Sequence, residues 1–81
     1  GYVLPVLIIE DDRLVRKLLK KLLQPQGFEV VEAMTGEEGL ALVSSVRPAL
    51  ILCDWNLPGI DGLSVCRTIK ANPDWSDVYF I

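Results

Sequence analysis

Four segments rich in apolar residues are spaced along the chain, at residues 3–9, 28–33, 49–53 and 78–81. The first shows no alternation between apolar and polar positions and consists mainly of Val, Ile and Leu. That composition is typical of a strand that is covered on both faces, as the inner strands of a parallel sheet are. All four segments are short enough for strands, so the pattern predicts four of them.

The segment after the first predicted strand has apolar residues three and four positions apart, which is the spacing of one face of a helix. Asp12 can cap the N-terminus of this helix, and Pro25 with Gly27 can end it. The pattern therefore predicts an amphipathic helix. Its apolar face consists of Leu14, Val15, Leu18, Leu19, Leu22 and Leu23.

A second helix is predicted to start at Thr35. Thr35 followed three residues later by Glu38 has the spacing of a capping box, in which each side chain accepts a hydrogen bond from the backbone amide of the other residue. Because a proline disfavours helical backbone in the residue before it, the helix should end before Pro48. The residues expected to face inward are Leu40, Val43 and Val46.

A third helix is predicted to begin at Asp61 or Gly62 and to be stopped by Asn72 and Pro73. Strand and helix then alternate along the whole chain, which favours a parallel sheet with helices on both faces. We therefore predict an α/β fold with a doubly wound parallel sheet. The apolar positions of the third helix are Leu63, Cys66 and Ile69.

Carboxylates follow two of the predicted strands. Glu10, Asp11 and Asp12 come directly after the first strand, and Asp54 follows the third. Parallel strands place their carboxyl ends at the same edge of the sheet, where ligands bind in open α/β sheets. We therefore expect Glu10, Asp11 and Asp54 to share one crevice. Asp12 and Asp61 are explained as helix caps.

Three carboxylates in one crevice repel one another, and one would take up a proton unless a cation were present. Mg²⁺ is a hard cation that prefers oxygen ligands and keeps several waters, so it suits such a pocket. Asp54 beside Mg²⁺ could act as a nucleophile, because carboxylates form acyl phosphates in covalent mechanisms. For Asp54 taken alone, a purely structural role in the turn that follows it is the alternative.

Composition limits the classes of partner. The chain has 81 residues, enough for one domain, and a net charge of −3, which argues against direct contact with nucleic acid. Cys53 and Cys66 fit no metal-binding spacing and are expected to be small buried hydrophobic residues. No segment is long enough to span a membrane, and we expect a cytoplasmic protein. The basic residues of the first helix, which we interpret as a solvated face, are Arg13, Arg16, Lys17, Lys20 and Lys21.

Two segments resemble motifs of one protein family. Residues 7–12, Leu-Ile-Ile-Glu-Asp-Asp, and residues 54–62, Asp-Trp-Asn-Leu-Pro-Gly-Ile-Asp-Gly, are similar to motifs of the receiver domains of two-component response regulators. The resemblance implies a flavodoxin-like fold with three layers, α/β/α, and a sheet of order 2-1-3-4-5. The present chain would supply strands 2-1-3-4 of that sheet, without the fifth.

The resemblance also implies roles for individual residues. Asp54 would accept a phosphoryl group from a histidine kinase or a phosphotransfer protein. Asp11, Asp54 and the backbone carbonyl of Asn56 would bind Mg²⁺ directly, and Glu10 would act through a metal-bound water. Phosphorylation would shift the domain between two conformations that change an output, so the chain would be a signalling switch and not a dedicated enzyme. The resemblance leaves a homodimer open.

Receivers of this family also carry a Ser or Thr at the end of the fourth strand and a Lys at the end of the fifth, and both contact the phosphoryl group. The present chain stops at Ile81, before both positions. Lys70 is no substitute, because it lies on the third predicted helix. Residues 1–81 are therefore expected to be an incomplete receiver domain, which binds metal yet phosphorylates poorly.

Three other functions were weighed against a phosphorylated receiver. A phosphatase of the haloacid dehalogenase type needs a second acid two residues after its nucleophile, and that position is Asn56 here. A flavin-binding module needs a phosphate cradle after the first strand, where Glu10 and Asp11 would repel phosphate. A receiver-like interaction module that is never phosphorylated stays open as the alternative.

Overall fold

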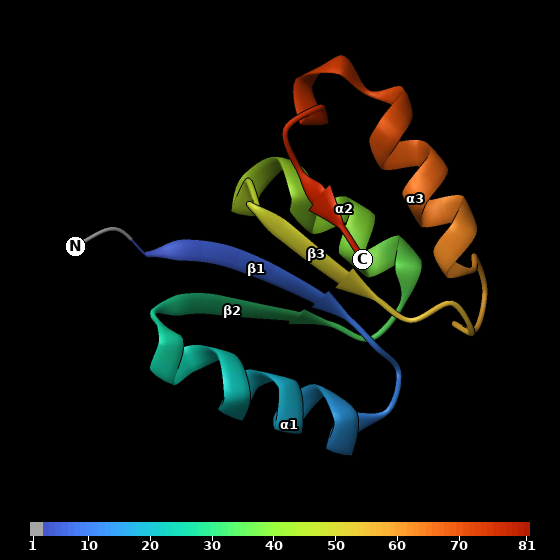
Figure 1. Cartoon of the computed structure of the whole chain (residues 1–81). Helices are drawn as coiled ribbons and strands as arrows, with labels where there is room; N and C mark the ends of the chain where they lie inside the picture. The colour runs from blue at the N-terminus through green and yellow to red at the C-terminus, as the bar shows by residue number, and fades with distance from the viewer. Residues whose placement is uncertain (1–2) are drawn as a thin grey trace.

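The computed structural model describes residues 3–81. Within this range four strands form one parallel sheet of order β2-β1-β3-β4, as predicted, with helices on both faces (Figure 1). The strands are β1 (Leu4–Ile9), β2 (Phe28–Ala33), β3 (Leu50–Cys53) and β4 (Tyr79–Phe80). The helices are α1 (Arg13–Leu23), α2 (Gly36–Val46) and α3 (Gly62–Ala71), with 3₁₀ turns η1 (Gln24–Gln26) and η2 (Pro73–Trp75).

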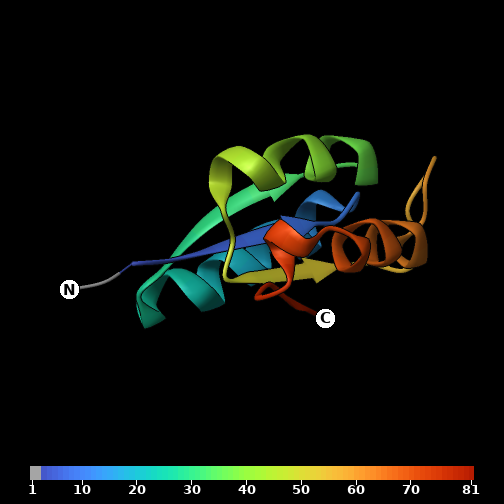
Figure 2. The same cartoon turned by 90° about the horizontal axis from the view of Figure 1, so that it is seen from above.

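The sheet, in which β1 is an inner strand, separates two layers of helices. Its residues 6–9 are completely buried, which explains why the sequence shows no polar position there. Because side chains alternate between the faces of a strand, Leu7 and Ile9, which join the main core, lie on one face of β1, and Val6 and Ile8 lie on the other. Figure 2 shows α1 on one side of the sheet and α2 on the opposite side. The main core consists of Leu7, Ile9, Ala33, Val43, Ile51, Leu57, Val65 and Ile69.

Aspartates cap two helices as predicted. The Asp12 carboxylate accepts hydrogen bonds from the amides of Leu14 and Val15, at 2.8 and 3.2 Å. The Asp61 carboxylate accepts one from the amide of Ser64 at 2.9 Å, and this bond lowers the pKa of Asp61. These three bonds satisfy amides that have no partner within the helix. The two helices that follow β1 and β3 therefore start at positions fixed by local sequence.

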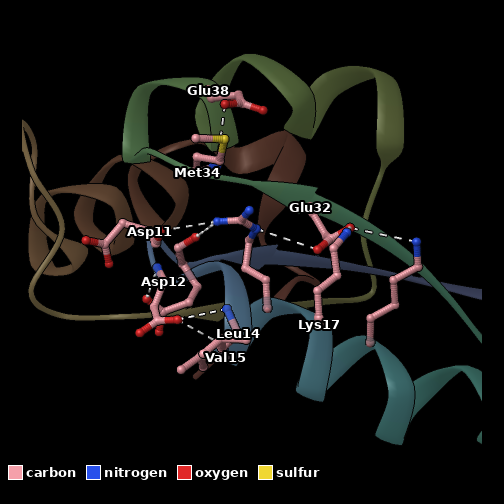
Figure 3. Close-up of polar contacts among 11 residues, drawn as sticks. Asp11, Asp12, Leu14, Val15, Lys17, Glu32, Met34 and Glu38 are labelled. Carbon is pink, nitrogen blue, oxygen red and sulfur yellow. Dashed lines mark hydrogen bonds and ion pairs between the residues drawn. The ribbon is translucent and has the colours of Figure 1, made fainter.

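The capping box of α2 forms in a modified way. Thr35 Oγ1 accepts a hydrogen bond from the amide of Glu38 at 3.0 Å, which is the predicted half of the motif. The Glu38 carboxylate reaches back to the amide of Met34, at 3.4 Å, and not to that of Thr35 (Figure 3). The start of α2 was thus predicted correctly, and the reciprocal bond is displaced by one residue.

The apolar face of α1 is covered only in part. Leu14, Leu18 and Leu22 are 81, 57 and 59% exposed. The buried residue of α1 is instead Arg16, which is 7% exposed, so its interpretation as part of a solvated face is wrong. Among residues 3–81, no second helix lies beside α1 on its face of the sheet to cover the leucines.

Three predicted strands and one helix face differ in detail from the prediction. β1 and β3 each begin one residue later than predicted, and β4 is shorter, although the amide of Ile81 continues the ladder to the carbonyl of Ile51 at 2.9 Å. On α3 the inward positions are Val65 and Ile69, four residues apart, whereas Leu63 is 41% exposed. No helix in the described part of the chain is long and apolar enough to cross a membrane.

Candidate functional site

The ends of β1 and β3 bring the acidic residues together. These strands are neighbours in the sheet, with Ile9 opposite Cys53, and the amide of Asp54 donates to the carbonyl of Ile9 at 3.0 Å. Carboxylate oxygens of Glu10, Asp11 and Asp54 consequently lie within 4.8 Å of one another. Among residues 3–81 this is the one group of three or more His, Cys, Asp or Glu side chains with the spacing of a metal site.

Electrostatics within this acidic cluster favour a cation. Burial raises the pKa of Glu10, and the neighbouring charges of Asp54 and Asp11 raise it further, although a hydrogen bond from the Asp12 amide opposes the rise. A raised pKa means that the site resists holding its full negative charge. Since all three side chains offer oxygen, the donor set fits a hard divalent cation such as Mg²⁺.

A groove of about 310 Å³ opens beside the acidic cluster. Asp54 is half-buried and forms part of its wall, so its carboxylate can be approached from outside. A larger hollow of about 640 Å³ includes Pro48 and Ala49 at the other end of β3, remote from the clustered carboxylates. The residues that line the smaller groove are Ile9, Glu10, Leu19, Leu52, Cys53, Asp54, Trp55 and Ile81.

The loop after Asp54 folds back on it. The amide of Asn56 donates to Asp54 Oδ1 at 3.3 Å, and Asn56 itself is exposed. Gly59 adopts a left-handed conformation with φ of 76°, which suits glycine in a tight turn. The contact seen for Asn56 is thus made by its amide, and a role of its carbonyl in metal binding stays a prediction.

Cys53 borders the groove without adding to the donor set. Burial, followed by the nearby charge of Asp54, raises the pKa of the thiol to about 11. The thiol is therefore neutral at neutral pH, whereas a metal ligand would have to be a thiolate. Cys53 and Cys66 are free and half-buried, so they are less enclosed than the sequence led us to expect.

Two residues that support residues 10–12, the acidic loop after β1, were missed by the sequence analysis: Arg16 contacts this loop directly, and Glu32 contacts Arg16. Arg16 Nη1 donates to the backbone carbonyls of Glu10 and Asp11, at 2.9 and 3.3 Å. Glu32 on β2 forms an ion pair with Arg16, and Figure 3 shows Lys17 reaching the same carboxylate. The sequence carried no signal for this pair, because the register that places Glu32 opposite Ile8 is fixed only when the sheet forms.

Comparison with known proteins decides the family. A model of the response regulator receiver domain matches residues 6–81. The chain belongs to this family. It is a receiver domain of two-component response regulators, as the two sequence motifs and the strand order had indicated.

Curated relatives of this receiver domain are longer than the chain. The transcriptional regulatory protein AfsQ1 of Streptomyces coelicolor is 49% identical over 65 residues, which make up 80% of this chain and 29% of that protein. The response regulator MprA of Mycolicibacterium vanbaalenii is 39% identical over 69 residues, or 85% of this chain and 30% of that protein. The receiver domain thus spans less than a third of either relative.

Solved structures agree with the fold. The response regulator TrrA of Thermotoga maritima, crystallised in complex with Mg²⁺ and BeF, has a TM-score of 0.88 at 33% identity and covers 96% of this chain and 66% of its own. The chemotaxis response regulator CheY4 of Vibrio cholerae has a TM-score of 0.92 at 25% identity, with coverage of 98% and 66%. Both likenesses extend over nearly the whole of this chain and about two thirds of each solved chain.

Proposed function

We propose that Asp54 is the phosphoacceptor of this receiver domain. The observation that carries the proposal is the cluster of three carboxylates within 4.8 Å at the carboxyl ends of adjacent strands. Glu10 and Asp54 both line the groove, and Asp54 is the member that is followed by the exposed Trp55 and Asn56. A carboxylate placed there can meet a phosphodonor while the other acids hold a cation next to it.

The reaction is a transfer between two nucleophiles. A carboxylate oxygen of Asp54 attacks phosphorus and forms an acyl phosphate, while the bond from phosphorus to the donor breaks and its electron pair stays with the donor. The hydrogen bond from the Asn56 amide holds Oδ1 and leaves Oδ2 as the attacking atom. The protein's main contribution is to position Asp54 and to exclude other orientations of the carboxylate.

Mg²⁺ is the cofactor that we propose for this site. Asp11 and Asp54 would bind it directly, together with the backbone carbonyl of Asn56, and Glu10 would act through a metal-bound water. The three carboxylates lie within 4.8 Å of one another, so a cation bound between them would offset their mutual repulsion. When bound, Mg²⁺ neutralises charge on the phosphoryl oxygens.

The phosphodonor is proposed to be a phosphohistidine of a histidine kinase or of a phosphotransfer protein, in keeping with the two-component family. The receiver domain then acts as a switch that transfers the group to itself and loses it by hydrolysis, and not as a dedicated enzyme. Its phosphorylation would bias a pre-existing equilibrium between conformations.

Labelling with a small phosphodonor tests the proposal. Incubation of the receiver domain with acetyl phosphate and Mg²⁺ should add one phosphoryl group, detected by intact-mass measurement. Asp54→Asn should abolish the addition, because an amide is a poor nucleophile. The matched control is Asp61→Asn on the same loop, which keeps a residue suited to capping α3 and should leave labelling intact.

Two outcomes would count against this assignment. Labelling that persists in Asp54→Asn would place the phosphoacceptor elsewhere. Absence of labelling in the receiver domain, with Mg²⁺ present, would favour the alternative of a receiver-like interaction module that is not phosphorylated.

A further inference from the structure

Arg16 is a buried cation one helical turn from the acidic loop. It is 7% exposed, although its neighbours on α1 are largely open to solvent. A buried guanidinium is costly unless its donors and its charge find partners. In this receiver domain the guanidinium donates hydrogen bonds to the backbone of the acidic loop. The Glu32 carboxylate pairs with its charge from the opposite side.

The guanidinium bonds to the acidic loop through backbone and not through carboxylates. Its Nη1 lies 2.9 Å from the carbonyl oxygen of Glu10 and 3.3 Å from that of Asp11. One planar group thus ties together two successive peptide units. Because these are the residues whose side chains enter the acidic cluster, fixing their peptides restricts where the two carboxylates can lie.

Glu32 holds the other edge of the guanidinium. Its Oε1 lies 3.6 Å from Arg16 Nε and has no hydrogen-bond partner among the described residues. Its Oε2 lies 3.0 Å from Lys17 Nζ and 3.7 Å from Lys20 Nζ. Glu32 is in register with Ile8 on β1, so the sheet fixes its position directly below α1. The guanidinium is therefore held between a rigid strand and the acidic loop.

We propose that Arg16 is a positioning residue that sets the Mg²⁺ affinity of the site by holding the peptides of Glu10 and Asp11. This inference rests on the proposed function, since it assumes that the acidic cluster binds Mg²⁺. Outer groups that orient metal ligands typically change metal affinity by 10- to 100-fold when removed. Arg16 has no contact with the bound cation in this proposal and acts only through the loop.

Arg16 affects the Mg²⁺ affinity in two ways that have opposite signs, and this makes the proposal testable. A positive charge near the cluster repels Mg²⁺, so simple loss of the charge would strengthen metal binding. Loss of the hydrogen bonds to Glu10 and Asp11 would let the two carboxylates move and would weaken metal binding. Lys17 provides a matched control, because it pairs with the same Glu32 carboxylate but forms no bond to the acidic loop.

The experiment is a Mg²⁺ titration of the receiver domain without phosphodonor, followed by tryptophan fluorescence, to which Trp55 beside Asp54 contributes. Arg16→Met should raise the dissociation constant for Mg²⁺ by about 10- to 100-fold. Lys17→Met should leave it unchanged or slightly lower it. Unchanged or tighter binding by Arg16→Met would overturn the proposal, because the charge would then be all that Arg16 contributes.

A second readout separates positioning from general stability. In labelling with acetyl phosphate, the half-saturating Mg²⁺ concentration should rise in Arg16→Met, while the rate at saturating Mg²⁺ should recover. The proposal would be overturned if Arg16→Met lowered the labelling rate at saturating Mg²⁺ but left the half-saturating Mg²⁺ concentration unchanged. If Arg16→Met does not fold, Arg16→Lys takes its place, since it keeps the charge but lacks the planar donor group, and it too should weaken Mg²⁺ binding.

Failure of the further inference is distinguishable from failure of the proposed function. If the unsubstituted domain shows no Mg²⁺ binding in the titration, the acidic cluster is not a metal site, and both proposals fall. If the unsubstituted domain binds Mg²⁺ and Arg16→Met binds it equally well, the inference on Arg16 falls alone.

Discussion

The α-carbon of Gly62 lies directly against the backbone carbonyl of Asp54. A β-carbon at position 62 would meet that oxygen at 2.5 Å and the α-carbon of Trp55 at 2.9 Å. The amide of Gly62 also donates to the carbonyl of Trp55 at 3.2 Å. The first turn of α3 therefore packs on the backbone that presents the proposed phosphoacceptor, and only a glycine permits this approach.

Gly62→Ala should displace the proposed phosphoacceptor. The clash is with backbone and cannot be relieved by rotating a side chain, so we expect a loss of about 1–3 kcal/mol in the free energy of unfolding. Labelling of Asp54 by acetyl phosphate should fall as well. Urea unfolding and the labelling rate measure the two effects. Thr68→Ala, at an exposed position of the same helix, is the control and should change neither.

The Glu32 carboxylate should make stability depend on pH in the acid range. Its hydrogen bond to Lys17 lowers the pKa of Glu32 below the ordinary value of 4.5, and the charges of Lys20 and Arg16 lower it further. A lowered folded-state pKa stabilises the protein above pH 4.5, and this stabilisation is lost as the pH falls through the folded-state value. Glu32→Gln should therefore lose stability at neutral pH and approach the parent below pH 4.5.

Urea unfolding in the presence of a chelator measures this difference without a contribution from the metal site. The gap in unfolding free energy between the parent and Glu32→Gln should narrow as the pH is lowered. A gap that stays constant across the acid range would show that the Glu32 carboxylate has the same pKa in the folded and unfolded states.

Gly39 on α2 and Ile9 on β1 are predicted to be coupled in stability. A β-carbon at position 39 would meet Ile9 Cδ1, and it would lie 2.7 Å from Ile9 Cγ1. Gly39→Ala gains about 1 kcal/mol of helix propensity, but overpacking of a buried contact costs about 1–3 kcal/mol. We therefore expect a net loss of stability, which Ile9→Val should partly relieve by removing Cδ1.

Urea unfolding of both single variants and the double variant measures the coupling. The double variant should be more stable than the sum of the two single losses predicts, by at least about 0.5 kcal/mol. Ile69→Val, a core substitution on α3, is the control partner and should add independently to Gly39→Ala. Additive losses for Gly39 and Ile9 would show that α2 shifts away from β1 at no cost.

Local sequence determined the elements and their starting points. Asp12, Thr35 and Asp61 cap the three helices as expected, because a cap depends on one side chain and on amides two or three residues away. The alternation of strand and helix similarly predicted the parallel sheet, since crossover connections leave few other arrangements. Because parallel strands place their carboxyl ends at the same edge of a sheet, the sequence also predicted that Glu10 and Asp54 would lie at that edge.

Tertiary structure alone decided which side chains of α1 are enclosed. The periodicity of α1 marks its leucines as the inward face, yet Leu18 is largely exposed and Arg16 is buried. The partner that makes this burial tolerable is Glu32, sixteen residues further along the chain and on a different element. Such a pairing depends on how α1 packs against β2, which is decided only in the folded protein. The periodicity of the α1 segment could not predict the burial of Arg16, because the energy of a buried charge depends on groups distant in sequence that folding brings near.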